Sequence, residues 1–254
     1  MISALTRGKL STQQENMEDI LTSCVFDALR LVNPADGVIP LLSDAIFWSD
    51  KTRKLGHISS THSHEAVGFD FWPRYSAPGI NACEPDVVIT FEAAKAIVLI
   101  EAKLHSEKSS YPDDDPFPND QLAREWDQLL VEAERLGYEP FLVYLTTDVR
   151  IPRASIKESV EEFTKKRPGL QTPQIYWLPW CNIQKLTRLN QKLRSDFDQL
   201  IQRLGIGGFG SWQQVTPVPV FDFGDLTQRL GTGALSNWKQ VKSVPVFEFQ
   251  QSRE

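Results

Sequence analysis

EPDVVITFEAAKAIVLIEAKL, residues 84–104, decides the fold, because it contains two apolar runs separated by a short polar connection. The runs at 85–91 and 96–103 are rich in Val, Ile and Leu and have the length of β-strands. Residues 92–95 are short enough to connect them as an antiparallel pair. The stretch therefore predicts a hairpin of two largely buried strands.

Three ionisable side chains lie at the open end of this hairpin. If Phe91 lies opposite Ala96, the same register places Asp86 opposite Glu101. Side chains alternate along a strand, so Glu101 and Lys103 share a face. We therefore expect two carboxylates and one ammonium group to converge at one end of the sheet.

The remaining sequence alternates between helical and strand patterns. Apolar residues recur at helical spacing within 12–32, and Asn33 and Pro34 follow as a helix stop. The other predicted elements are a short helix or turn at 39–48, strands at 66–75, 141–148 and 173–180, and helices ending at Gly137, at 153–167 and at about 181–203. This order predicts an α/β domain with helices packed on a mixed sheet.

The C-terminal part of the chain is a tandem duplication with a period of 26 residues. Residues 197–223 align without a gap to residues 223–249. Each copy is expected to form a short helix, a Gly-rich turn, a Trp and a strand of the form V-P-V-F, with its proline at a sheet edge or bulge. We interpret the chain as a domain at 1–196 followed by a repeat appendage at 197–249. The appendage is either a structural flap or a surface for a homodimer or protein partner.

Composition limits the class of protein. The chain has 254 residues, of which 41% are hydrophobic and 24% charged, as in an ordinary globular protein. The sequence has no apolar run long enough to span a bilayer and no secretory signal at its N-terminus, so we predict a cytoplasmic protein without a membrane partner. The net charge of −6 argues against a nonspecific nucleic-acid coat, although a carboxylate metal site is itself acidic.

The pair of acids at the hairpin end needs a counter-charge. Two carboxylates about 5 Å apart repel each other by roughly 3 kcal/mol at an effective dielectric near 20. Mg²⁺ prefers oxygen ligands and is commonly held by one or two carboxylates. Asp86 and Glu101 suit such an ion, with the backbone carbonyl of Ala102 as a further ligand and Mn²⁺ as the alternative metal. Lys103 would orient a water molecule or stabilise a charged transition state.

At these residues the chain resembles the PD-(D/E)xK nuclease superfamily, which has the restriction-endonuclease-like fold. Its motif corresponds to Pro85-Asp86, followed by Glu101, Ala102 and Lys103. The resemblance also covers the order of elements, because that core is a helix, a three-stranded meander, a helix and a further strand. It implies a mixed sheet flanked by helices and spans a little over half of the chain.

The resemblance also implies further site residues. A further acid on the first helix corresponds to Glu18, with Glu15 as its rival, and it would bind a metal ion or orient one. A glutamine on the helix after the second motif strand corresponds to Gln121, which would contact water or phosphate. As sequence candidates for phosphate-backbone contacts we add Lys108, Ser109 and Arg124.

These patterns together predict a metal-dependent phosphodiesterase, an endo- or exonuclease that hydrolyses DNA. RNA is the alternative substrate. The resemblance implies a defence, restriction or mobile-element setting. The alternative function is a non-catalytic module that binds nucleic acid or protein, with the duplicated C-terminal segment as the partner-binding edge.

Overall fold

The computed structural model describes residues 13–56, 58, 66–104, 108–109, 116–203, 212–215 and 246–249. The chain divides into two compact units, Met1–Ile206 and Gly207–Glu254. The predicted boundary at 196/197 lies inside the last helix of the first unit.

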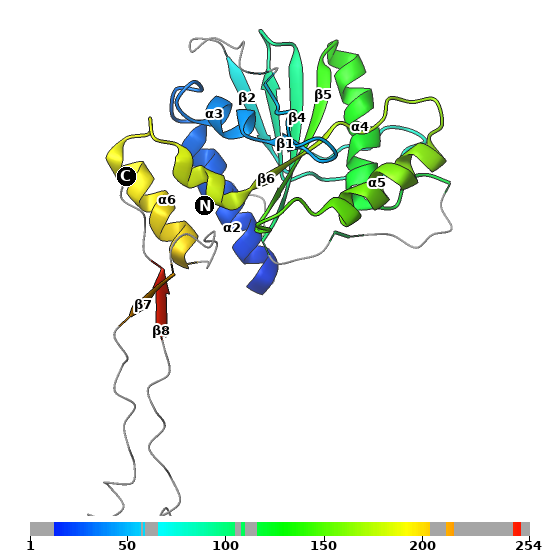
Figure 1. The fold of residues 1–254 in the computed structure, drawn as a ribbon. Helices are drawn as coiled ribbons and strands as arrows, with labels where there is room; N and C mark the ends of the chain where they lie inside the picture. The colour runs from blue at the N-terminus through cyan, green and yellow to red at the C-terminus, as the bar shows by residue number, and fades with distance from the viewer. Residues whose placement is uncertain are drawn as a thin grey trace, which may run out of the picture. The chain divides into compact units, whose positions relative to one another are not determined.

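The first unit is built on a six-stranded mixed sheet with the strand order β1-β6-β5-β4-β3-β2 (Figure 1). Its strands β2, β3 and β4 form an antiparallel meander, β4, β5 and β6 run parallel, and β1 is antiparallel to β6. The strands are β1 (Ile46–Phe47), β2 (Val67–Phe71), β3 (Val87–Phe91), β4 (Ala96–Lys103), β5 (Glu139–Thr146) and β6 (Ile175–Pro179). The α/β class and the mixed sheet agree with the sequence prediction.

The predicted hairpin at 84–104 is present in the predicted register. Phe91 is paired with Ala96, and Val87 is paired with Ile100. The turn between the strands brings Lys95 to a φ of 46°. Since Val87 lies opposite Ile100, the next step along each strand brings Asp86 to the level of Glu101.

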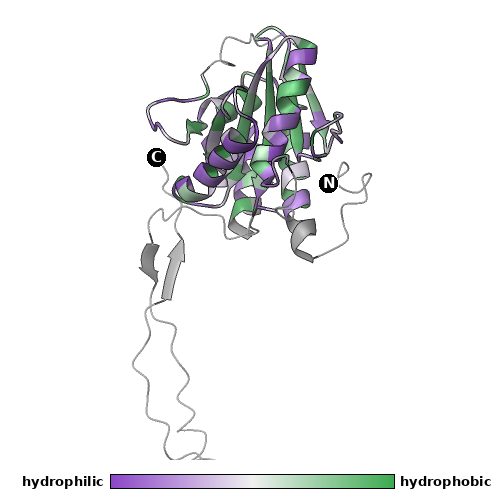
Figure 2. Ribbon diagram, turned by 90° about the vertical axis from the view of Figure 1, so that its right-hand side faces the viewer, coloured by the Kyte–Doolittle hydropathy of each residue, from purple (hydrophilic) through white to green (hydrophobic). Residues whose placement is uncertain are grey.

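Helices cover both faces of this sheet. They are α2 (Gln13–Leu29), α3 (Val38–Ser43), α4 (Gln121–Leu136), α5 (Arg153–Lys166), the 3₁₀ helix η2 (Trp180–Lys185) and α6 (Gln191–Arg203). One buried cluster joins the sheet to α2, α3, η2 and α6, and the other joins it to α4 and α5. In Figure 2 the strands are largely hydrophobic, while the helices also carry hydrophilic residues.

The side chains of β4 illustrate how the two layers are specified. Val98 and Ile100 belong to the cluster on the α2 side, while Ile97 and Leu99 belong to the cluster on the α4 side. Alternation along the strand therefore carries Glu101 onto the face that α4 covers. A sheet buried on both faces explains why this strand reads as a continuous apolar run.

Capping residues define α4 as the sequence suggests. The side chain of Asp120 accepts a hydrogen bond from the Ala123 amide at the N-terminus. Gly137 ends the helix with a φ of 68°, a left-handed conformation that glycine adopts without steric cost. Gln121 is thereby fixed as the first residue of the helix.

Three element predictions differ from the structure. The strand expected at 66–75 ends at Phe71, because Trp72 has a φ of 49° and Pro73 follows it. The helix expected at about 181–203 is split into η2 and α6, and the Asn190 side chain caps the second piece by accepting a hydrogen bond from the Leu193 amide. The segment 39–48 forms the end of α3 and also the short strand β1.

The second unit is described only in part. Its two described strands, β7 (Trp212–Val215) and β8 (Val246–Phe249), pair antiparallel. The β8 strand contains V-F-E-F of the second repeat, as predicted. The V-P-V-F segment of the first repeat, at 218–221, lies outside the described residues. Among the described helices, none is long and apolar enough to cross a membrane.

Candidate active site

Asp86 is held beside the end of β4 by two hydrogen bonds. Its Oδ2 accepts the Ala102 amide at 2.8 Å. Its backbone carbonyl accepts the Trp72 amide at 3.0 Å, which ties it to the end of β2. The residue is 8% exposed. The structure thus brings the aspartate to the strand that carries Glu101, as the register requires.

Glu101 is almost completely buried, at 2% exposure, and one of its two oxygens is saturated. Its Oε1 lies 2.7 Å from the Lys103 ammonium and accepts a hydrogen bond from the Gln121 side-chain amide. Its Oε2 is buried and has no hydrogen-bond partner among the residues that the structure describes. A buried carboxylate oxygen without a donor is costly, so this atom marks a place for a cation or a proton.

Lys103 lies between two acidic side chains. Its Nζ is 2.7 Å from Glu101 Oε1 and 3.4 Å from Glu18 Oε1. The other oxygen of Glu18 accepts the Leu104 amide at 2.7 Å. Glu18 therefore binds the end of β4 from α2 and contacts the lysine. Glu15 also lies in α2, but its side chain is outside the described part.

Both the nitrogen and the oxygen of the Gln121 side-chain amide form hydrogen bonds. Its Nε2 donates to Glu101, and its Oε1 accepts the Ser109 backbone amide at 3.1 Å. The two contacts fix the orientation of the amide. Gln121 therefore connects the segment after β4 to the buried carboxylate. Ser109 reaches the site through its backbone, and its predicted contact with phosphate stays a prediction.

Lys108 and Arg124 make contacts within the protein. The Lys108 ammonium donates to Asp120 Oδ2 at 2.6 Å, to the Ser155 carbonyl at 2.7 Å and to Ser159 Oγ at 2.6 Å. Arg124 is buried, and its guanidinium donates to the Asn119 carbonyl at 2.6 Å. Both cations thus stabilise the start of α4 in this structure, and their predicted contacts with a nucleic-acid backbone are untested.

Glu125 is a site residue that was not predicted from the sequence. It lies on α4 one turn after Gln121, it is 1% exposed, and its side chain lies beside that of Glu101. The available signal was the spacing of four residues from Gln121, which places both side chains on one face of a helix. On α4 this face lies beside the apolar stripe and not within it. From the sequence, Glu125 therefore looked like an ordinary solvent-exposed helix residue.

The electrostatics of the cluster are dominated by burial and by its excess of acids. Burial and the neighbouring Glu101 raise the pKa of Asp86, and burial and Glu125 raise the pKa of Glu101. Burial also raises the pKa of Glu125 to about 7. For Lys103, burial lowers the pKa, but the carboxylates of Glu101, Glu18 and Asp86 outweigh burial and raise it above its ordinary value.

The Mg²⁺ or Mn²⁺ expected from the sequence stays a prediction, and its candidate ligands are oxygen atoms. Asp86, Glu101 and the Ala102 carbonyl offer oxygen atoms, and Glu101 Oε2 has no donor among the described residues. Within the described residues no three His, Cys, Asp or Glu side chains converge closely enough to hold a metal by themselves. An ion that keeps several waters and takes one or two carboxylates matches this arrangement.

Comparisons with protein-family models, with curated proteins and with solved structures found no match to this chain. The site must therefore be interpreted from its own geometry.

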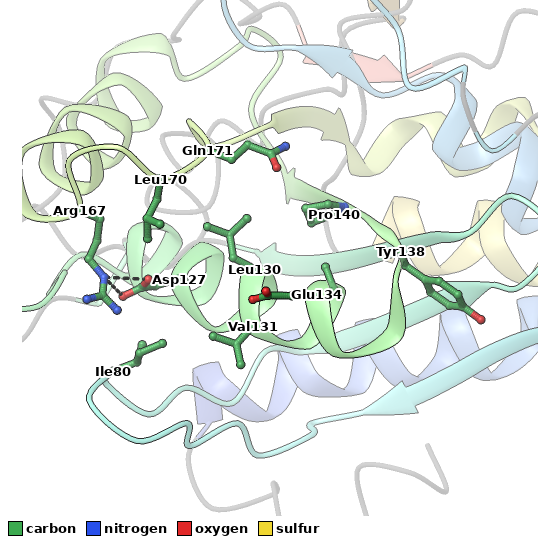
Figure 3. A pocket seen from close by; sticks show the side chains of 11 residues that line it. Ile80, Asp127, Leu130, Val131, Glu134, Tyr138, Pro140, Arg167, Leu170 and Gln171 are labelled. Carbon is green, nitrogen blue, oxygen red and sulfur yellow. Dashed lines mark hydrogen bonds and ion pairs between the residues drawn. The ribbon is translucent and has the colours of Figure 1, made fainter.

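A separate pocket of about 460 Å³ lies along the side of α4 that carries Asp127, Leu130 and Glu134 (Figure 3). Arg167 binds Asp127 at its rim with hydrogen bonds of 2.9 and 2.7 Å. The pocket shares no residue with the acidic cluster of Glu18, Asp86, Glu101 and Glu125. The dashed lines in Figure 3 join only Arg167 and Asp127, so the ionic contact drawn there lies within the protein. We assign the candidate active site to the cluster at the end of β4.

Proposed function

We propose that this protein is a Mg²⁺-dependent nuclease that hydrolyses phosphodiester bonds. The observation that supports this best is the meeting of Asp86, Glu101 and Lys103 at one end of β3 and β4, with a buried Glu101 oxygen that has no donor among the described residues. A buried excess of carboxylates is stable only with a compensating charge.

Asp86 and Glu101 would hold the ion, with the Ala102 carbonyl as a further ligand. The bound ion would lower the pKa of a water molecule and offset negative charge on the phosphate. Glu18 was predicted to bind or orient a metal ion. Its contacts with Lys103 and the Leu104 amide favour the orienting role.

Lys103 suits an electrostatic role. An ammonium group fixed between two carboxylates is positively charged and has a defined position. It can hold a phosphate oxygen or the attacking water by a charge-assisted hydrogen bond. Gln121 lies at the N-terminus of α4, where the helix dipole also favours an anion. These two residues would orient the substrate against the carboxylates.

The order of elements supports a restriction-endonuclease-like core. The helix α2, the meander β2-β3-β4, the helix α4 and the strand β5 occur in the order that the resemblance implies, with α3 and β1 inserted between α2 and β2. DNA is the proposed substrate, with RNA as the alternative.

The test is digestion of supercoiled plasmid with Mg²⁺ or Mn²⁺, with single-stranded DNA and RNA as parallel substrates. We expect metal-dependent cleavage by the wild type and none in EDTA. Asp86→Asn and Lys103→Met should abolish it while circular dichroism shows a folded protein. Glu134→Gln, an exposed acid on α4, should cleave like the wild type.

Two results would contradict the proposal. Absence of cleavage with every metal and substrate would reject the nuclease, and binding of nucleic acid without cleavage would favour the non-catalytic module. Cleavage that survives Asp86→Asn would place the activity elsewhere in the chain.

A further inference from the structure

Glu125 is a buried acid in contact with the carboxylate that would bind the metal. Its side chain comes from α4 and lies beside that of Glu101, and each residue is at most 2% exposed. The Oε2 atoms of both residues are buried and have no partner among the described residues. Two buried acceptor oxygens without a donor between them are satisfied by a cation or by a proton at that place.

The neighbouring cations donate no hydrogen bond to either Oε2 atom. Lys103 is bonded to Oε1 of Glu101 rather than Oε2. The guanidinium of Arg124 donates to the Asn119 carbonyl. The acids Glu18, Asp86, Glu101 and Glu125 outnumber the two cations Lys103 and Arg124 that act on them among the described residues, and burial disfavours any uncompensated charge.

We infer that Glu125 is a further acidic residue of the cation site, where it interacts through an intervening water with the ion held by Asp86 and Glu101. This inference rests on the proposed function. Direct ligation by Glu125 is disfavoured, because no three acidic side chains among the described residues converge as a metal-binding group. An indirect contact suits Mg²⁺, which keeps several waters.

The structure also explains why a glutamate occupies this position. Gln121 saturates Oε1 of Glu101 from the first turn of α4, and Glu125 approaches the same side chain one turn later. A carboxylate can accept hydrogen bonds from water molecules around the ion, whereas an apolar residue would leave them unbonded. Outer groups of this kind orient the ligands and tune the affinity for the metal.

The test is Mn²⁺ binding by isothermal titration calorimetry, with no nucleic acid present. Glu125→Gln keeps the size and removes the charge, and we expect Mn²⁺ to bind about 10- to 100-fold more weakly than to the wild type. Glu125→Asp keeps the charge and should bind more tightly than Glu125→Gln. Glu134→Gln is the matched control on the exposed side of the same helix and should bind as the wild type does.

The outcomes separate this inference from the proposed function. If Asp86→Asn loses Mn²⁺ binding but Glu125→Gln and Glu125→Asp both bind within about twofold of the wild type, the role of Glu125 is rejected and the metal site remains. If the wild type itself binds no Mn²⁺, the proposed metal site fails as well. Thermal melting in EDTA checks the fold, and the melting temperature of Glu125→Gln should not fall below that of the wild type, because a buried acid has been neutralised.

Discussion

Replacing Lys103 with Met removes the ammonium group that holds two acids together, and we expect it to destabilise the metal-free protein. The Nζ lies 2.7 Å from Glu101 and 3.4 Å from Glu18. With an effective dielectric of about 20, these separations correspond to attractions of roughly 6 and 5 kcal/mol. Most of this is offset by the cost of burying the lysine itself. Removing one partner of a buried pair typically costs about 3 to 5 kcal/mol, which is the loss we expect here.

The assay is urea unfolding in EDTA, followed by circular dichroism. The midpoint should fall while the slope stays constant, since the unfolded surface is unchanged. Lys103→Arg keeps the charge and should lose less. Lys192→Met removes an exposed lysine on α6 and should change stability by no more than about 0.5 kcal/mol.

A double-mutant cycle isolates the pair with Glu18. In a Glu18→Gln background one of the two carboxylates is already neutral, so Lys103→Met should cost less, with a coupling of about 0.5 to 3 kcal/mol. A loss below about 1 kcal/mol for Lys103→Met alone, or a coupling near zero, would refute the reasoning. The carboxylates would then not depend on the lysine, and the geometry of the cluster would be wrong.

Two further perturbations test the metal and the fold. At a Mg²⁺ concentration of about 100 times its dissociation constant, binding should stabilise the wild type by about 2.7 kcal/mol. For a unit of this size the melting temperature should rise by about 5 to 11 °C in scanning fluorimetry. Asp86→Asn should show no rise, and a rise of equal size in this variant would contradict the assignment. Arg167→Met leaves Asp127, whose side chain is 1% exposed, without its two hydrogen bonds of 2.9 and 2.7 Å. Urea unfolding should show a loss of about 3 to 5 kcal/mol, and a loss below about 1 kcal/mol would mean that the aspartate is satisfied otherwise.

Local patterns were sufficient to predict the centre of the fold and the meeting of three site residues. The apolar runs and the short connection at 92–95 set the register, and a register error of one residue would have moved Glu101 to the other face of the sheet. The pairing of Phe91 with Ala96 confirms that register. Gln121 lies at the start of the helix after β4, where the resemblance placed it, and Asp120 caps that helix.

The partners of long polar side chains could not be predicted in this way. Lys108 looked like a cation in a polar loop, yet its ammonium is bonded to the capping residue Asp120 of α4 and to Ser155 and Ser159 on α5. Arg124 was expected to contact phosphate and is buried. Glu125 had only its spacing of four residues from Gln121 as a sequence signal. The environments of Lys108 and Glu125 are set by packing between elements that are separate in the sequence, and side-chain type alone does not specify them.

The topology explains why Gln121 and Glu125 lie near the end of β4. Parallel strands require a crossover, and α4 provides it between β4 and β5. The chain leaves β4 at Lys103 and must return to the beginning of β5, so α4 runs back along the sheet from the end of β4. Its first two turns, with Gln121 and Glu125, therefore lie over Glu101, and its last turn cannot reach that residue. The positive end of the helix dipole is placed at the same edge as the acids. An anionic substrate and the cation that neutralises it would thus be attracted to one edge of the sheet, where the carboxyl ends of the parallel strands also lie.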